Sequence, residues 1–237
     1  MHPARIIAIE TSGRRGSVAL AEGAALLEVS EFPADRDHAR DLVPTIDTLI
    51  RKHDLSPDEI DQCHLSIGPG SFTGLRVAVT FARHLALAVG TRLCAIPTLD
   101  VIAENCARMD QAPEHLAVIL DAKQGKVFAA VYERDGDGFR RVVEPSMIEP
   151  DRLLTNAPSP IAVVGEGIDY HAEVVHASGA EVLDRTLWQP RAANVHRLGW
   201  RMAERGELIE PTELTPFYLR RPEAEVLWEK RQGTIEL

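Results

Sequence analysis

The sequence contains few residues of several kinds, and each shortage excludes some classes of protein. Its three cysteines, Cys63, Cys94 and Cys106, are odd in number and have no metal-ligand spacing, so we expect buried, reduced thiols of a cytosolic protein. No apolar run is expected to reach membrane-span length, because Arg, Asp, Glu or His interrupts each one. Residues 1–5 lead directly into a strand pattern without the apolar region of a signal peptide. These shortages predict a cytoplasmic protein with no membrane partner.

Positive charge is also scarce. The 237 residues hold 26 Lys and Arg against 36 Asp and Glu, which gives a formal net charge of −10. A protein that binds nucleic acid alone needs clustered Lys and Arg for the phosphates. The notable basic cluster, at 220–221 and 230–231, is diluted by glutamates. We therefore expect contacts with nucleic acid to be carried mainly by a partner.

A pattern near the N-terminus is repeated in the middle of the chain. Residues 6–20 read as an apolar strand that ends in Glu10, a turn with glycine and a second strand, and residues 117–131 follow the same order with Asp121 as the acid. A third strand follows each pair, at 25–29 and 139–143. This repeat predicts an α/β fold of two lobes with duplicated mixed sheets flanked by helices. The lobes are assigned to 1–106 and 107–237, and the last helix and tail are expected to pack back on the first lobe.

The remaining elements follow from hydrophobic periodicity and turn residues. Strands are predicted at 63–67, 93–96 and 161–164, and helices at 35–53, 72–89, 98–107 and 194–205. Pro44 favours a kink or a start in the first of these helices. Thr98 is a candidate N-cap and Gly90 a candidate helix stop.

A glycine-rich run joins the strand at 63–67 to the helix at 72–89. The loop consists of Gly68, Pro69, Gly70, Ser71, Phe72, Thr73 and Gly74. Such a loop lets a backbone or a phosphate approach a helix N-terminus closely. It is not a Walker loop, because Arg76 and Val77 stand where Lys-Ser or Lys-Thr is needed. The residues alone leave open whether this tight junction is functional or structural.

Two helices carry apolar side chains beyond what one sheet face needs. A stripe of small residues on the second helix would let another helix approach, although packing within the chain explains part of the pattern. The predicted partner face consists of Leu42, Ile46, Leu49, Leu75, Ala78, Val79, Ala82 and Ala86.

Three segments together resemble one known family. Residues 9–12, 68–76 and 121–127 look like the TsaB family, within the actin/Hsp70/sugar-kinase (ASKHA) superfamily. The glycine run is the specific part of the likeness, which extends over most of the chain. The resemblance implies a subunit of the bacterial machinery that makes threonylcarbamoyladenosine (t6A) beside the anticodon of tRNAs that read codons beginning with A.

The resemblance also separates this chain from its catalytic relatives. TsaD-type enzymes carry a metal-binding His-x-x-x-His pair that matches the region of Thr98 and Ile102 here, and neither residue can bind metal as histidine does. A non-catalytic subunit without metal is therefore implied. Its implied partners are a TsaD-type catalytic subunit that binds through the two helices, a TsaE-type ATPase, tRNA indirectly, and a second copy when the chain is alone.

The hairpins suggest a reduced nucleotide cleft. In the superfamily they hold the phosphates of ATP, which assigns Thr11, Ser12, Gly13, Asp121 and Lys123 to a vestigial site. Bulky Arg14-Arg15 favours an ordinary hairpin, so no cofactor is expected to bind tightly, and ATP–magnesium would bind weakly or through the partner complex. The alternatives are an ATP-dependent small-molecule kinase of the same fold and a glycopeptidase-like hydrolase, against which the lack of a recognisable catalytic triad counts.

Overall fold

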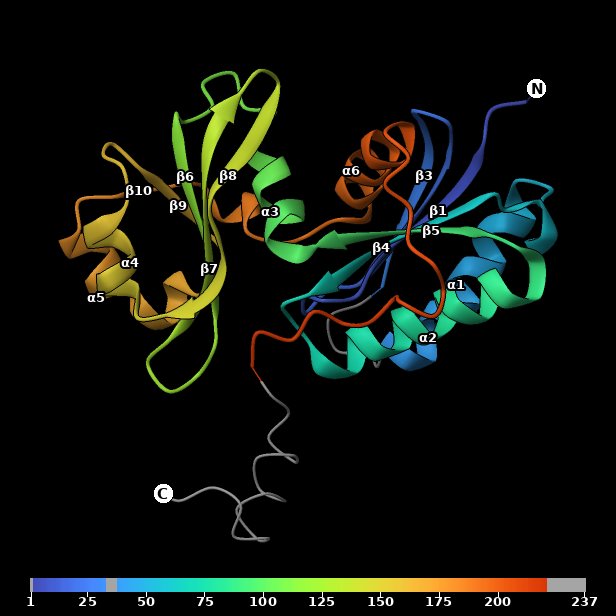
Figure 1. The fold of residues 1–237 in the computed structure, drawn as a ribbon, viewed down its shortest axis with the longest axis horizontal. Coiled ribbons are helices and arrows are strands. Elements are labelled where there is room, and N and C mark those ends of the chain that lie inside the picture. The colour runs from blue at the N-terminus through green and yellow to red at the C-terminus, as the bar shows by residue number, and fades with distance from the viewer. Residues whose placement is uncertain (1, 33–37, 221–237) are drawn as a thin grey trace, which may run out of the picture.

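The computed structural model describes residues 2–32 and 38–220, which form two lobes, each built on a five-stranded sheet (Figure 1). The predicted helix start at Asp35 and the basic residues from Arg221 onward lie outside the described residues. In the first sheet the strands lie in the order β3-β2-β1-β4-β5. Their bounds are β1 (Arg5–Glu10), β2 (Ser17–Glu22), β3 (Ala25–Glu31), β4 (Gln62–Gly68) and β5 (Arg92–Pro97).

The second sheet repeats the first. Its order is β8-β7-β6-β9-β10, so each sheet reads third, second, first, fourth and fifth strand of its lobe. In both, the first three strands are antiparallel and the fourth pairs in parallel with the first. The bounds are β6 (His115–Asp121), β7 (Val127–Asp135), β8 (Gly138–Ile148), β9 (Ala162–Val164) and β10 (Glu181–Val182). The predicted duplication of mixed sheets is confirmed.

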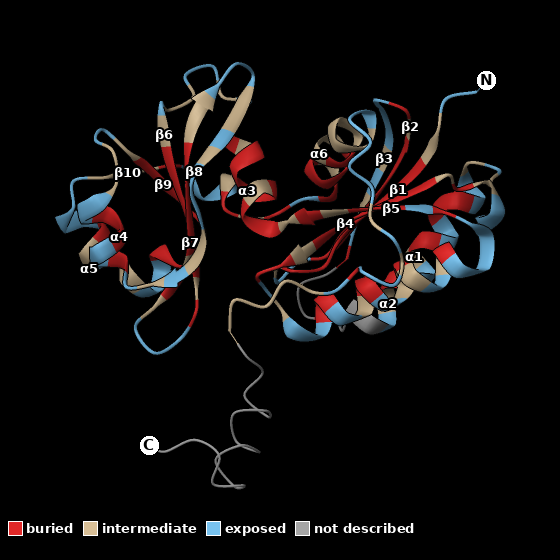
Figure 2. Ribbon diagram, in the orientation of Figure 1, coloured by how far each residue is buried: buried red, intermediate tan, exposed pale blue. Residues whose placement is uncertain are grey.

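Helices cover the first sheet on both faces. The helices α1 (His38–Lys52) and α2 (Phe72–Val89) lie on one face and α6 (Ala192–Glu204) on the other (Figure 1). The strand period explains this arrangement, because successive side chains point to opposite faces. Ile7 and Ile9 of β1 pack in the core with α1 and α2, while Ala8 packs with residues of α6. Figure 2 shows the central strands of both sheets as buried.

The shorter helices belong to the junction and the second lobe. The helix α3 (Thr98–Cys106) follows β5 and contacts strands of both sheets. The helices α4 (Pro150–Asn156) and α5 (Ile168–Ala177) pack on each other beside the second sheet, and two 3₁₀ turns lie at η1 (Pro57–Glu59) and η2 (Arg185–Leu187). The N-cap of α3 is Pro97, so Thr98 is the first helical residue and the prediction of Thr98 as the cap is wrong.

The helix α2 ends where the sequence predicts. Gly90 has a left-handed φ of 78°, and its N–H donates to the Ala86 carbonyl at 2.9 Å. The expectation that no window reaches membrane-span length is corrected here, because α2 is long and apolar enough by length and composition. Its buried residues pack against the first sheet and α1, so in this fold it forms a layer of the lobe.

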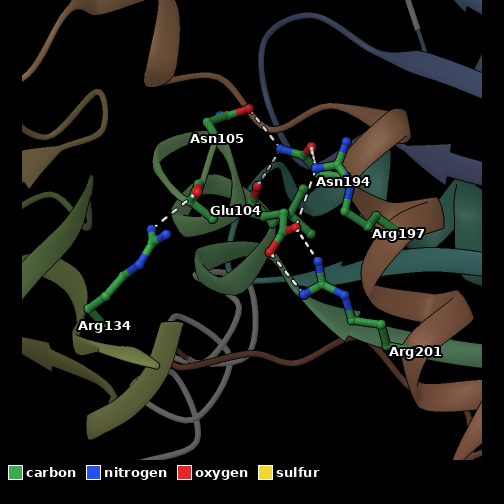
Figure 3. A network of polar contacts seen from close by, with 8 residues as sticks. Glu104, Asn105, Arg134, Asn194, Arg197 and Arg201 are labelled. Atoms are coloured by element: carbon green, nitrogen blue, oxygen red, sulfur yellow. Dashed lines mark hydrogen bonds and ion pairs between the residues drawn. The ribbon is translucent and has the colours of Figure 1, made fainter. Parts of the chain in front are cut away.

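The helix α6 comes from the end of the chain and packs on the first sheet, against β1 and β4 among other strands. A polar network fastens it to α3 (Figure 3). The carboxylate of Glu104, only 4% exposed, accepts from Arg201 at 2.8 Å and from Arg197 at 3.3 Å. The side-chain amide of Asn194 donates to Asn105 Oδ1 at 2.7 Å. The junction between the lobes is therefore held by α3 and α6 together.

Candidate functional site

The glycine loop is a place of close backbone approach. At Gly68, φ is 116°, and a Cβ would lie 2.7 Å from the carbonyl oxygen of Phe217. At Gly70 a Cβ would lie 2.5 Å from the carbonyl oxygen of Ser12. Any side chain at either position would collide with backbone, which is why both positions are glycine.

Hydrogen bonds fix the same loop to the first hairpin. The Ser71 N–H donates to the Ser12 carbonyl at 2.8 Å, and the Thr11 hydroxyl donates to the Gly74 carbonyl at 2.8 Å. The Ser71 hydroxyl caps α2 by accepting from the Gly74 N–H at 3.3 Å. These donors are therefore used within the fold. The loop is a structural junction between β4, α2 and the β1–β2 turn.

A cavity of about 390 Å³ lies between the lobes, beside this junction. It brings together most of the residues predicted for a nucleotide cleft. Ser12, Gly13, Gly70 and Ser71 line it from the first lobe, and Asp121 and Lys123 from the second. Thr11, which is fully buried, is absent from the lining. Ser12, Gly13, Asp121 and Lys123 of the predicted cleft thus line one cavity, and the prediction of a nucleotide site there stays a prediction.

The acid of this cavity is already paired. Asp121 Oδ2 lies 2.6 Å from Lys123 Nζ, and Oδ1 accepts from the Lys123 N–H at 3.0 Å. Burial acts to raise the pKa of Asp121, but these hydrogen bonds and the lysine charge outweigh it, so the pKa is lowered. The hydrogen bond to Asp121 raises the pKa of Lys123. The turn residues Lys123 and Gln124 both have positive φ, which places the lysine beside its own acid.

The acid of the first hairpin is enclosed. Glu10 is fully buried at the end of β1, and its Oε1 accepts from the N–H and hydroxyl of Ser12, each at 2.5 Å. The Ser66 hydroxyl also acts on the carboxylate of Glu10 and opposes the effect of burial on its pKa. The buried hydroxyl of Thr98 has no hydrogen-bond partner among the described residues. Burial raises the pKa of Glu10. The sequence showed an acid at a strand end but gave no sign of its complete burial.

The positions expected for metal ligands in the catalytic relatives also lie at this cavity. Thr98 and Ile102 of α3 are buried and line it. They offer one hydroxyl and one hydrocarbon side chain. Within residues 2–32 and 38–220, no group of three His, Cys, Asp or Glu side chains is placed to hold a metal ion.

The structure corrects the residues predicted for the partner face. All eight, Leu42, Ile46, Leu49, Leu75, Ala78, Val79, Ala82 and Ala86, are buried in the chain itself. The small residues and the apolar ones together form the side of α1 and α2 that packs on the sheet, so packing within the chain explains the pattern. Different apolar side chains lie on the exposed side of these helices, namely Val43, Phe72, Leu87 and Val89.

A second cavity lies outside the residues predicted from the sequence. It measures about 520 Å³ and is lined by four arginines, Arg14, Arg15, Arg185 and Arg191, among other residues. The Arg14-Arg15 pair is visible in the sequence, but its neighbours lie far along the chain. No local pattern could have indicated the cluster.

Comparisons with known proteins agree with this geometry. The sequence profile of the family described as "TsaD: tRNA N6-adenosine threonylcarbamoyltransferase" matches residues 32–228. The chain is 27% identical over 235 residues to the tRNA threonylcarbamoyladenosine biosynthesis protein TsaB of Escherichia coli, covering 97% of this chain and 99% of the relative. It is 26% identical to the protein of the same name from Bacillus subtilis, covering 96% and 99%.

Solved structures show the same likeness. YeaZ from Pseudomonas aeruginosa superposes with a TM-score of 0.78 at 25% identity, covering 90% of this chain and all of that one. A second Pseudomonas aeruginosa structure, described as an uncharacterized protein with similarity to peptidase YeaZ, gives a TM-score of 0.81 at 26% identity over 92% of this chain. With its duplicated sheets, its glycine junction and a profile match over most of its length, this chain belongs to the TsaD-related family, as a member of the TsaB type.

Proposed function

We propose that this chain is the non-catalytic subunit that supports threonylcarbamoyl transfer to adenosine in tRNA by a TsaD-type catalytic subunit. The observation that carries the proposal is the pair Thr98 and Ile102. They line the cavity between the lobes at the positions where the catalytic relatives are expected to hold metal with histidines. A threonine hydroxyl and an isoleucine side chain cannot replace two imidazoles. The metal and the threonylcarbamoyl adenylate would therefore be held by the partner.

The chemistry of the cavity favours a non-catalytic, supporting role over a kinase activity. A kinase-like site needs a carboxylate available to magnesium or to a substrate hydroxyl. Here Asp121 is engaged by Lys123, and Glu10 is enclosed beneath the hairpin. ATP–magnesium would accordingly bind weakly, or only in the assembled complex.

The exposed side of α1 and α2 is the proposed contact surface for the partner. Val43 is 52% exposed and Leu87 is 75% exposed, on neighbouring helices of the first lobe. A pseudo-symmetric pairing with the equivalent helices of a homologous partner would cover these side chains. The isolated chain would pair with a second copy through the same surface. A TsaE-type ATPase would complete the cytoplasmic assembly, and tRNA would be bound mainly by the other subunits.

Co-purification tests the proposal. The tagged chain should retain the TsaD-type subunit from an extract of its own cells, identified by mass spectrometry. The variant Leu87→Arg should lose this subunit, because a charge would enter a desolvated contact. The matched control is Val142→Arg, at a 40% exposed valine of the second lobe, and it should retain the subunit.

Two results would contradict the proposal. Equal retention by Leu87→Arg and Val142→Arg would place the contact elsewhere. Micromolar ATP–magnesium binding with turnover by the isolated chain, measured by calorimetry and product assay, would favour the kinase alternative.

A further inference from the structure

The arginine-lined cavity gathers positive charge from two distant segments. Arg14 and Arg15 lie in the β1–β2 turn, and Arg185 and Arg191 lie in the stretch from η2 to the start of α6. Its remaining lining residues are Gly16, Ser17, Glu31, Thr186, Gln189 and Pro190. In a chain with a net charge of −10, four guanidinium groups around one cavity form a local exception to the overall field.

Carboxylates balance only part of this charge. Arg14 lies 3.7 Å from Glu166, and Arg185 lies 2.5 Å from Asp169. Arg15 and Arg191 contact no carboxylate in the part of the chain that the structure describes. Arg191 instead donates to the Thr186 carbonyl at 2.8 Å. Among residues 2–32 and 38–220, the cavity therefore has two guanidinium charges without an ion-pair partner.

The two existing ion pairs leave their arginines available. The side chains of Arg14 and Arg185 are 71% and 72% exposed, and ion pairs in such positions contribute only about 0–1 kcal/mol. A phosphate can therefore compete with the carboxylates for these arginines. The remaining acid of the lining, Glu31, is a single opposing charge.

The backbone around the cavity is held by hydrogen bonds to β2 and α3. The N–H of Ala192 donates to the Ser17 hydroxyl at 3.0 Å, which joins the start of α6 to β2. The Asn105 side chain donates to the Leu187 and Gln189 carbonyls, each at 2.8 Å. The backbone segments that carry the arginines are thus held in place before any ligand binds.

The shape and charge of the cavity indicate its ligand. Guanidinium groups match phosphate oxygens with paired N–H donors. The exposed arginines at its edge suit a chain of phosphates that crosses the surface better than one enclosed anion. We propose that this cavity binds the phosphodiester backbone of an RNA, which rests on the proposed role in tRNA modification. The chain would then contact tRNA directly, in addition to the indirect contact through a partner that its composition predicts.

Fluorescence anisotropy with a labelled tRNA transcript tests the proposal on the full chain. The double variant Arg15→Gln/Arg191→Gln removes the two unbalanced charges. The matched control Arg108→Gln/Arg152→Gln removes two exposed arginines elsewhere. At 50 mM salt we expect about tenfold weaker binding for the cavity variant, and a salt dependence shallower by about 2 in log–log slope, one for each phosphate contact. The control should bind within about twofold of the unmodified chain.

The proposal would be overturned by unchanged binding by the cavity variant, by equal losses in both variants, or by no tRNA binding by the unmodified chain at 50 mM salt. Displacement of the tRNA by submillimolar ATP or inorganic phosphate would also overturn it, because it would indicate a site for a small anion.

The same variants separate this proposal from the function proposed above. If the cavity variant retains the TsaD-type subunit and binds tRNA normally, the RNA site fails and the subunit role stands. If the unmodified chain does not retain the subunit but tRNA binding depends on the cavity arginines, the subunit role fails and the RNA site stands. Matching thermal midpoints of both variants would exclude misfolding as the cause.

Discussion

Gly70 lies directly against the backbone of Ser12. A Cβ at Gly70 would be 2.5 Å from the Ser12 carbonyl oxygen, and the same oxygen accepts from the Ser71 N–H at 2.8 Å. The glycine loop and the first hairpin therefore form one rigid junction. This contact accounts for a glycine in the loop without any ligand.

Replacing that glycine should destabilise the fold by overpacking. We expect Gly70→Ala to lower the free energy of unfolding by about 3 kcal/mol, because backbone must move to admit a methyl group. The control Gly90→Ala has open space but a φ of 78°, so it should cost only about 1 kcal/mol of backbone strain. Urea denaturation measures both. Equal losses of unfolding free energy in the two variants would show that the close approach of Gly70 to Ser12 does not affect stability.

The burial of Ala82 gives a second prediction. Its side chain is fully buried between α2 and the sheet, so Ala82→Arg should lower the free energy of unfolding by at least about 3 kcal/mol. Leu87→Arg, on the exposed side of the same helix, should change it by about 0.5 kcal/mol or less. If the Ala82→Arg variant unfolded cooperatively at the same midpoint temperature as the unmodified chain, the assignment of Ala82 to the core would be contradicted.

Glu10 should make stability depend on pH. Its pKa is raised in the fold by burial, so its contribution is fully present below its unfolded value of about 4.5 and is lost as the pH rises through the folded pKa. Glu10→Gln keeps an acceptor for Ser12 and has no charge. Its stability relative to the unmodified chain should therefore increase from pH 5 to pH 8. A constant difference across that range, measured by urea midpoints, would contradict an enclosed carboxylate.

His64 should have the opposite dependence. Burial lowers its pKa to about 3, and the ring of His196 lies 6.3 Å away, centroid to centroid. Because the folded state favours the neutral ring, its contribution is complete above the unfolded pKa of about 6.5 and is lost as the pH falls toward 3. His64→Gln should flatten the loss of stability between pH 6.5 and pH 5.

The matched control for this measurement is His84→Gln, at an exposed histidine of α2. If His64→Gln and His84→Gln gave the same slope, another group would be responsible for the titration.

Local patterns predicted much of the fold. The helix α2 has the bounds that periodicity predicts, 72–89. Its cap, its C-terminal glycine and its apolar face are all determined by residues of one short segment. The repeat of two hairpins predicted the duplicated sheets, since each hairpin is local in sequence. The direction of the apolar face was harder to assign. The stripe that includes Ala82 could pack against the sheet or against a partner, and only the folded structure shows that it packs against the sheet.

The site was predicted in part for the same reason. Short segments placed Ser12, Gly13 and Asp121 at one cleft through the family resemblance, and all three line the cavity. The pairing of Asp121 with Lys123 depends on a left-handed turn that the sequence does not announce. The arginine cluster joins a turn near residue 15 to a segment near residue 190, and such pairings depend on tertiary structure.

The position of α6 has a consequence for how the chain is made. This helix, at residues 192–204, covers one face of a sheet whose strands lie within the first 97 residues. During synthesis the N-terminal strands leave the ribosome long before the helix that shields Ala8 and Cys94 exists. The first lobe is therefore the first to be translated but cannot be finished until the second lobe has emerged. Until α6 has emerged, the sheet face that it will cover is exposed. At this stage the nascent chain would need protection by a chaperone.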